Sequence, residues 1–141
     1  MEEVADKKQE KNNNNLIDEI EIYLKDVIEQ NEKVIDISDT NIGDFGAKCV
    51  GAILQMCDNL EEIRLNNCGI QDEGAINIFE ELNKIVDSKV NTIELSQNQI
   101  SENSFEALVI LLESNPKVGR VDLSLNKVEK EFGREVLSDY G

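Results

Sequence analysis

The side chains that most often perform chemistry in proteins are sparse in this sequence. It contains no histidine, and its three cysteines, at positions 49, 57 and 68, form no Cys-x-x-Cys pair. The Ser-His and Cys-His arrangements of nucleophilic catalysis need a histidine, and zinc sites need clustered cysteine or histidine ligands. The sequence also lacks both glycine-rich phosphate-binding motifs, G-x-x-x-x-G-K-[ST] and G-x-G-x-x-G. We therefore expect no enzyme activity, no metal, no cofactor and no small-molecule substrate.

One short segment imitates the start of a calcium-binding loop. Asp36-Ile-Ser-Asp-Thr40 carries oxygen-bearing side chains at the alternating positions where such a loop begins. However, Asn41 stands where the loop needs its sixth-position glycine, and Ala47 stands where it needs a bidentate glutamate. We therefore reject calcium binding.

The other polar candidates belong to a pattern that repeats along the chain. Segments that begin at Leu60, Val90 and Val118 each have apolar residues at their first, fourth, sixth and eleventh positions. A degenerate copy begins at Glu32, so the copies are spaced by 28, 30 and 28 residues. A fixed period in this range indicates stacked structural repeats.

These segments resemble the leucine-rich repeat, whose pattern is L-x-x-L-x-L-x-x-N/C-x-L, and the 28-residue spacing is similar to that of the ribonuclease-inhibitor-like subclass. The resemblance implies an α/β fold: a short leucine-rich-repeat solenoid, or horseshoe segment, with a parallel sheet on its concave face and helices on its convex face. In this family the ninth residue of a repeat turns inward and satisfies backbone groups. Here the ninth residues are Thr40, Cys68, Asn98 and Asn126.

The pattern divides the chain into four segments. Residues 1–15 are expected to be a disordered acidic and Asn-rich tail, and residues 16–31 an N-terminal capping helix. Residues 32–137 hold the four leucine-rich repeats, and residues 138–141 are the C-terminal end. The capping helix is predicted from apolar residues at helical spacing between Leu16 and Ile28. A partner-binding role for this helix is an alternative. We also expect a short helix after Val128 that covers the last strand only in part.

The helices of the repeats have recognisable starts. Asp44 and Asp72 each lie two residues after the last apolar position of a repeat, so we expect each to cap the helix that follows it. The second repeat carries two extra residues within 83–89. Such an insertion is either a tolerated loop extension or part of a binding face.

The concave sheet face is the predicted binding surface, because it is the commonest binding site of leucine-rich repeats. Its candidate residues are Asp36, Ser38, Glu62, Arg64, Asn66, Thr92, Glu94, Ser96, Arg120, Asp122 and Ser124. Strands in register would place Arg64 beside Asp36 and Glu94. We expect the acidic side chains to face the solvent. Two interpretations stay open: a self-satisfied polar sheet, or a hydrogen-bonding surface for a partner.

Composition narrows the class of partner. Thirty acidic residues against 14 basic ones give a net charge of −16. This charge disfavours nucleic acid and anionic membranes, permits a basic protein partner, and on its own also serves solubility. The charged N-terminus is unlike a signal peptide, and no apolar run is long enough to span a membrane. Together with the odd number of cysteines, these features predict an intracellular, cytoplasmic location.

Three functions agree with these features. The first is a non-enzymatic protein–protein interaction module that binds a partner through its concave face. In the second, the helix that runs into the repeats is similar in architecture to the C-terminal domain of tropomodulins, which implies an association with actin and the cytoskeleton. The third is a structural subunit of a larger cytoskeletal or ciliary assembly.

Overall fold

The computed structural model describes residues 2–128 and 135–138 of the chain. Its helices are α1 (Glu2–Glu29), α2 (Gly43–Ile53), α3 (Asp72–Asn83) and α4 (Phe105–Ser114), with short 3₁₀ helices η1 (Leu54–Met56) and η2 (Glu102–Ser104). Its strands are β1 (Val34–Asp36), β2 (Glu62–Arg64), β3 (Thr92–Glu94), β4 (Arg120–Leu123) and β5 (Glu135–Ser138). None of these helices has an apolar stretch of the length that a membrane span requires.

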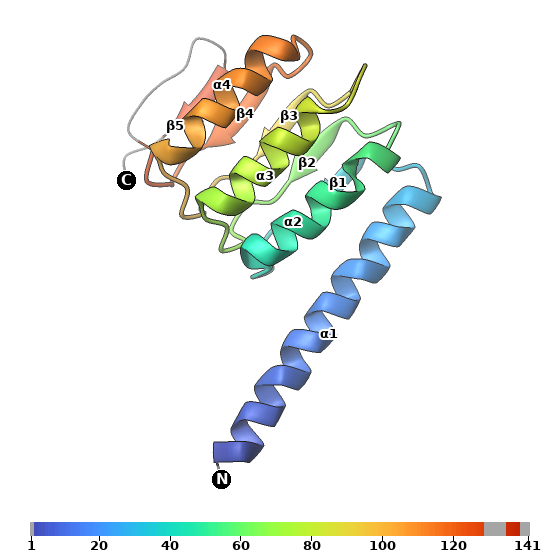
Figure 1. Cartoon of the computed structure of the whole chain (residues 1–141), viewed down its shortest axis with the longest axis vertical. Coiled ribbons are helices and arrows are strands. Elements are labelled where there is room, and N and C mark those ends of the chain that lie inside the picture. Colours follow the sequence, from blue (N-terminus) through green and yellow to red (C-terminus); the bar gives the residue numbers. More distant parts are fainter. Residues whose placement is uncertain (1, 129–134, 139–141) are drawn as a thin grey trace.

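The strands form one parallel sheet in the order β1-β2-β3-β4-β5, and α2, α3 and α4 lie side by side over one face of it (Figure 1). The second residue of each strand of the repeats pairs with its equivalent in the next strand: Ile35, Ile63, Ile93 and Val121. All four side chains are fully buried against the helices. Because side chains alternate along a strand, the residues on either side of them face away from the helices. We call that opposite face the concave face.

The core between sheet and helices is built mainly from aliphatic residues. The helices contribute apolar stripes to it, including Val50, Ile78, Leu108 and Leu111, all of which are fully buried. Phe79 is the largest of the fully buried side chains. Each repeat therefore buries its own apolar face against its neighbours, as a solenoid requires.

The turn after each strand depends on a residue in the left-handed conformation. The eighth residue of every repeat has a positive φ: Asp39 at 65°, Asn67 at 53°, Gln97 at 57° and Leu125 at 57°. Asp and Asn adopt this conformation readily, whereas it is uncommon for leucine. The shared conformation aims the ninth residue of each repeat into the solenoid.

The predicted inward orientation of the ninth residues is confirmed most clearly at Asn98, whose side chain makes hydrogen bonds to backbone groups of the turn. Asn98 donates from Nδ2 to three carbonyl oxygens, those of Leu65, Leu95 and Ser96, at 2.9–3.1 Å. Its Oδ1 accepts from the N–H groups of Cys68 and Ile70. One buried side chain thus bonds to five backbone groups, and the carbonyl of Leu65 and the N–H groups of Cys68 and Ile70 would otherwise lie unsatisfied in the core.

Helix α1 is longer than the predicted capping helix. It begins at Glu2, so the structure differs here from the tail expected over residues 1–15. Residues 2–11 are mostly strong helix formers such as Glu, Lys, Gln and Ala, and they can extend an existing helix without a new nucleation step. The predicted capping contact is present, because Ile20, Leu24 and Val27 are buried. Figure 1 shows the N-terminal end of α1 projecting past α2.

The end of the sheet also differs from expectation. Residues 135–138 form the strand β5, paired in parallel with β4, where a short helix was expected; residues 129–134 lie outside the described part of the chain. The prediction of a partly covered edge on β4 is therefore wrong. A parallel edge offers a row of unpaired backbone groups, and Val136 and Leu137 have side chains compatible with a strand.

The two aspartates predicted to cap their own helices cap the next repeat instead. Asp44 Oδ1 accepts from the N–H groups of Gln71 and Gly74, at 2.8 and 3.1 Å, at the start of α3. Asp72 likewise accepts from the backbone N–H and the hydroxyl of Ser101, at 2.7 and 2.6 Å. Each carboxylate therefore joins two helices and stabilises the stacking of the repeats.

Candidate protein-interaction surface

The predicted residues lie together on the concave face. The register pairs Val34, Glu62, Thr92 and Arg120 in one row and Asp36, Arg64, Glu94 and Asp122 in a second. Ser38, Asn66, Ser96 and Ser124 follow the strands in a third row, and hydrogen bonds described below join the first three of them. The face carries four carboxylates and two guanidinium groups among these positions, so its net charge is −2.

Arg64 stands at the centre of an ionic cluster. Its Nη2 lies 2.6 Å from Glu62 Oε2, its Nε lies 3.6 Å from Glu94 Oε2, and its Nη1 lies 4.0 Å from Asp36 Oδ2. The hydrogen bond to Glu62, and the charges of the three carboxylates, raise the pKa of Arg64 above its ordinary value. The cluster confirms the predicted proximity of Arg64 to Asp36 and Glu94, and it leaves two negative charges uncompensated.

Asn66 connects the ionic cluster to the row of hydroxyl groups. Its Nδ2 donates to Glu94 Oε1 at 2.8 Å, and its Oδ1 accepts from both the N–H and the hydroxyl of Ser96 at 2.9 Å. The backbone N–H of Asn66 donates to Ser38 Oγ at 3.2 Å. These bonds run across three repeats and hold the polar side chains in fixed positions, which lowers the entropic cost of binding a partner.

The C-terminal side of the face has its own polar pair. Asp122 Oδ1 accepts from the backbone N–H and the hydroxyl of Ser124, at 3.0 and 2.6 Å. Thr92 donates its hydroxyl to Asn91 at 2.7 Å, and Arg120 pairs with Thr92 in the register of β3 and β4. The eleven predicted residues thus form one continuous surface, in which many of the polar groups already have a partner.

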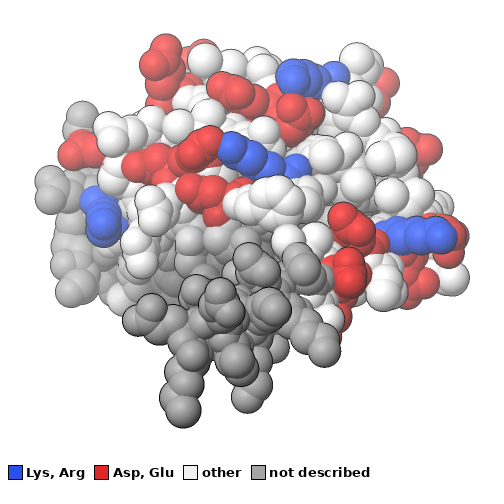
Figure 2. All heavy atoms as spheres, turned by 60° about the horizontal axis from the view of Figure 1, so that its bottom comes forward, with Lys and Arg blue, Asp and Glu red and all other residues white. Residues whose placement is uncertain are grey.

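The acidic side chains are less exposed than the sequence suggested. Asp36 is exposed, whereas Glu62, Glu94 and Asp122 are half-buried. The expectation that the acidic side chains face the solvent therefore holds only in part for these three, because each makes hydrogen bonds or ion pairs along the sheet. Figure 2 shows acidic side chains outnumbering basic ones over the described part of the face that it presents.

One residue next to this surface was missed by the sequence reasoning. Tyr23, on α1, accepts a hydrogen bond at its hydroxyl from the backbone N–H of Asp36 at 2.9 Å. A hollow of about 200 Å³ lies beside it, lined by Glu19, Tyr23, Asp36 and Ser38 among others. The helical stripe indicated only that Tyr23 packs inward, and gave no sign that it reaches the concave face.

The surroundings of the three cysteines are not those of reactive thiols. Burial raises the pKa of the Cys68 thiol to about 11, and its Sγ donates to the carbonyl of Ile37 at 3.2 Å. Burial also raises the pKa of Cys49 and Cys57. Thiols of this kind stay protonated and are poor nucleophiles at neutral pH. Within the described residues no three cysteine or carboxylate side chains are grouped as metal ligands would be.

The comparisons with known proteins agree with this geometry. A family model described as leucine-rich repeat matches residues 57–79, which span the second repeat from before β2 into α3. A search of the curated proteins finds no match. Among solved structures, the chain is similar to one titled "Leiomodin-1 Actin-Binding Site 2 (ABS2)", with a TM-score of 0.64 and 15% sequence identity. The match covers 79% of this chain and 64% of that one. The predicted fold class, a short leucine-rich-repeat solenoid, is thereby confirmed.

Proposed function

We propose that this leucine-rich-repeat solenoid is a non-enzymatic interaction module that binds another protein through the concave face of its sheet. The observation that carries the proposal is the pre-arranged polar surface around Arg64, where three carboxylates surround a single guanidinium group. The excess of negative charge favours a partner surface that presents Lys or Arg together with hydrogen-bonding groups.

The two interpretations of the concave face differ in what the uncompensated charge does. A self-satisfied sheet would need no excess of acid, whereas a partner-binding sheet uses it to attract a basic surface. The half-buried positions of Glu62 and Glu94 strengthen their interaction with an arriving cation, because water screens them less than it screens a fully exposed group. These features favour the partner-binding interpretation.

The test is capture of the partner with wild type and with an amide variant. Glu62→Gln, Glu94→Gln and Asp122→Asn together remove three charges but keep the side-chain shape and one acceptor oxygen at each position. The matched control is Asp18→Asn, Glu21→Gln and Asp26→Asn on the exposed side of α1. A protein captured by wild type and by the control, but not by the concave variant, supports the proposal. Equal capture by all three forms contradicts it.

A second candidate function is an association with actin. It is favoured by the similarity in fold to the leiomodin structure, whose title describes an actin-binding site. A cytoskeletal location would follow from this function, and a cytoplasmic one from either candidate. Co-sedimentation with actin filaments, and capture of monomeric actin, would separate this candidate from the first. Absence of this protein from the filament pellet, together with absence of monomeric actin from the captured material, would reject it without affecting the general interaction proposal.

A further inference from the structure

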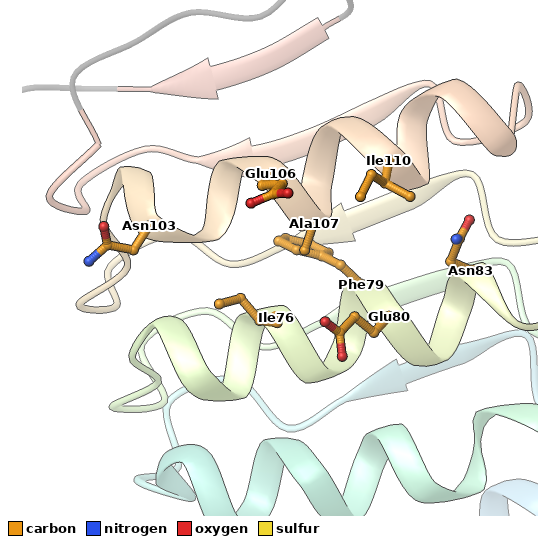
Figure 3. Close-up of a pocket in the computed structure, with 8 residues that line it drawn as sticks. All are labelled: Ile76, Phe79, Glu80, Asn83, Asn103, Glu106, Ala107 and Ile110. Carbon is orange, nitrogen blue, oxygen red and sulfur yellow. The ribbon is translucent and has the colours of Figure 1, made fainter.

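The helix side of the solenoid carries a second surface with binding character. A cavity of about 300 Å³ opens between α3 and α4, and Figure 3 shows its lining side chains projecting from both helices. We call it the convex groove. Its apolar lining is Ile76, Phe79, Ala107 and Ile110, and carboxylates border it at Glu80 and Glu106. Ile110 is 46% exposed, so a large aliphatic side chain of the lining is open to contact from outside.

The groove lies where the fourth helix lacks the glycine that lets the preceding pair of helices pack closely. A Cβ at Gly74 would lie 2.6 Å from Asp44 Oδ1 and 3.0 Å from the Cβ of Ala47, so α2 and α3 pack closely only with glycine there. Thirty residues later, Ser104 and Phe105 stand where the previous repeat has Gly74 and Ala75. The 3₁₀ helix η2 also replaces the first turn of α4. The close approach seen between α2 and α3 is therefore unavailable to α3 and α4.

The charge around the groove is one-sided. Helix α4 contains no Lys or Arg, and neither Glu80 nor Glu106 makes an ion pair within 4.0 Å in the described part of the chain. The cation on the neighbouring turn, Lys84, pairs with Glu81 at 2.9 Å. Glu81 raises the pKa of Lys84, and the charge of Glu80 adds a smaller contribution in the same direction. An apolar floor with a carboxylate on each side complements an apolar side chain that has cations on both flanks.

We propose that the convex groove binds an amphipathic helical segment of another protein, with one or two apolar side chains in the groove and Lys or Arg beside Glu80 and Glu106. The cavity volume is at the lower end of the range for ligand pockets, which suits single side chains. Helical segments present apolar anchors at i, i+3 and i+4 to grooves between helices, with basic residues on either side. This site is on the opposite side of the sheet from the concave face and does not depend on the function proposed for that face.

The probe for the test is a fluorescein-labelled amphipathic peptide of Leu and Lys, titrated by fluorescence anisotropy. Wild type should bind it. Ala107→Trp should abolish binding because the indole fills the groove. Glu80→Gln with Glu106→Gln should weaken it roughly tenfold, as expected for the loss of two partly exposed charge pairs. The matched control, Asp18→Asn with Glu21→Gln, changes the net charge equally on α1 and should bind as wild type does.

Three further results decide the proposal. Equal weakening in the α1 control and the groove variant would show attraction to net charge alone and overturn it. If Ala107→Trp lowers the melting temperature, Ile110→Ser is the variant to use in its place, since the exposed side chain of Ile110 can be removed without opening the core. A dimer in sedimentation velocity that Ile110→Ser dissociates would identify a second copy as the occupant and also overturn it. The variant with Glu62→Gln, Glu94→Gln and Asp122→Asn should keep peptide binding, so failure of the concave-face proposal is distinguishable from failure of this one.

Discussion

The side-chain oxygen of Asn98 accepts a hydrogen bond from the backbone N–H of Cys68 at 2.9 Å, so the ninth residue of one repeat closes the turn of the repeat before it. The two residues are 30 positions apart in the chain and occupy the same place in successive repeats. Asn126 repeats the relationship one step further, with its Oδ1 accepting from the N–H of Ile100 at 2.9 Å. This ladder holds the repeats in register independently of the apolar core.

Replacing Asn98 with alanine should therefore destabilise the protein more than its size suggests. The change leaves the carbonyl of Leu65 and the N–H groups of Cys68 and Ile70 without a partner, and we expect a loss of at least about 3 kcal/mol in the free energy of unfolding. Urea denaturation followed by circular dichroism measures it. Gln99→Ala, at an exposed neighbouring position, should change stability by less than about 0.5 kcal/mol. A similar small effect for both variants would show that water replaces the Asn98 bonds.

The apolar strand positions should dominate the stability of the core. Leu95 is fully buried, so Leu95→Ala should cost about 2–5 kcal/mol as a large-to-small core change. Ile22→Ala is the control, because Ile22 is 69% exposed on α1. The denaturation midpoint of each variant measures the difference. A midpoint for Leu95→Ala equal to that of wild type would contradict the inward orientation of this residue.

Stability should fall at alkaline pH partly through Cys68. Burial raises the pKa of its thiol from 9.0 to about 11, so the unfolded chain loses this proton at a lower pH than the folded protein does. The contribution is complete below about pH 9 and is lost as pH rises to about 11, with a maximum of about 3 kcal/mol. Unfolding of wild type and Cys68→Ala over this range checks it. The variant should show the shallower decline; parallel declines would rule out the Cys68 contribution.

Truncations should separate the two parts of α1. Deleting residues 1–14 should leave the melting temperature nearly unchanged, because Ile20, Leu24 and Val27, which α1 buries against the first repeat, all lie after the deleted segment. Deleting residues 1–30 should unfold or strongly destabilise the protein, since it exposes the core of the first repeat. Thermal melts followed by circular dichroism measure both. If the longer deletion melted like the full chain, α1 would not be a cap.

The inter-repeat caps should be visible in hydrogen exchange. Asp44→Ala removes the acceptor for the N–H groups of Gln71 and Gly74, so exchange at the start of α3 should accelerate and stability should drop by about 1 kcal/mol. The first turn of α2, where Asp44 itself lies, should be affected less. Exchange measured by NMR resolves the two helices. Faster exchange confined to α2 would mean that Asp44 caps its own helix in solution.

The repeat architecture could be predicted because each strand encodes it locally. The alternation at Ile63 and Leu65, or at Ile93 and Leu95, defines the buried face of a strand without reference to any other repeat. The fixed period then aligned these strands, which placed Arg64 correctly beside Asp36 and Glu94. The candidate residues of the concave face followed from the same register, although their role in binding a partner stays a prediction.

The features that the sequence did not predict depend on contacts between repeats or at the ends. Asp44 has the spacing of an N-cap for its own helix, and only the stacking distance shows that its carboxylate reaches α3. The convex groove arises where Ser104 stands in place of the glycine of the preceding repeat, which matters only once α3 is in place. The domain boundary at residue 16 was set by where the apolar stripe begins, whereas a helix continues as long as its residues permit.

The contact between Tyr23 and Asp36 has a consequence for self-assembly. An exposed edge of a parallel sheet is a template on which another strand can add, and repeated addition leads to fibres. On β1, the N–H of Asp36 points away from β2 and is already bonded to the Tyr23 hydroxyl at 2.9 Å. An incoming strand would have to break this bond and displace α1 before it could pair. The hydroxyl of Tyr23 therefore disfavours edge-to-edge aggregation at the N-terminal end of the solenoid. Tyr23→Phe would leave the N–H of Asp36 without this acceptor and open to a neighbouring molecule.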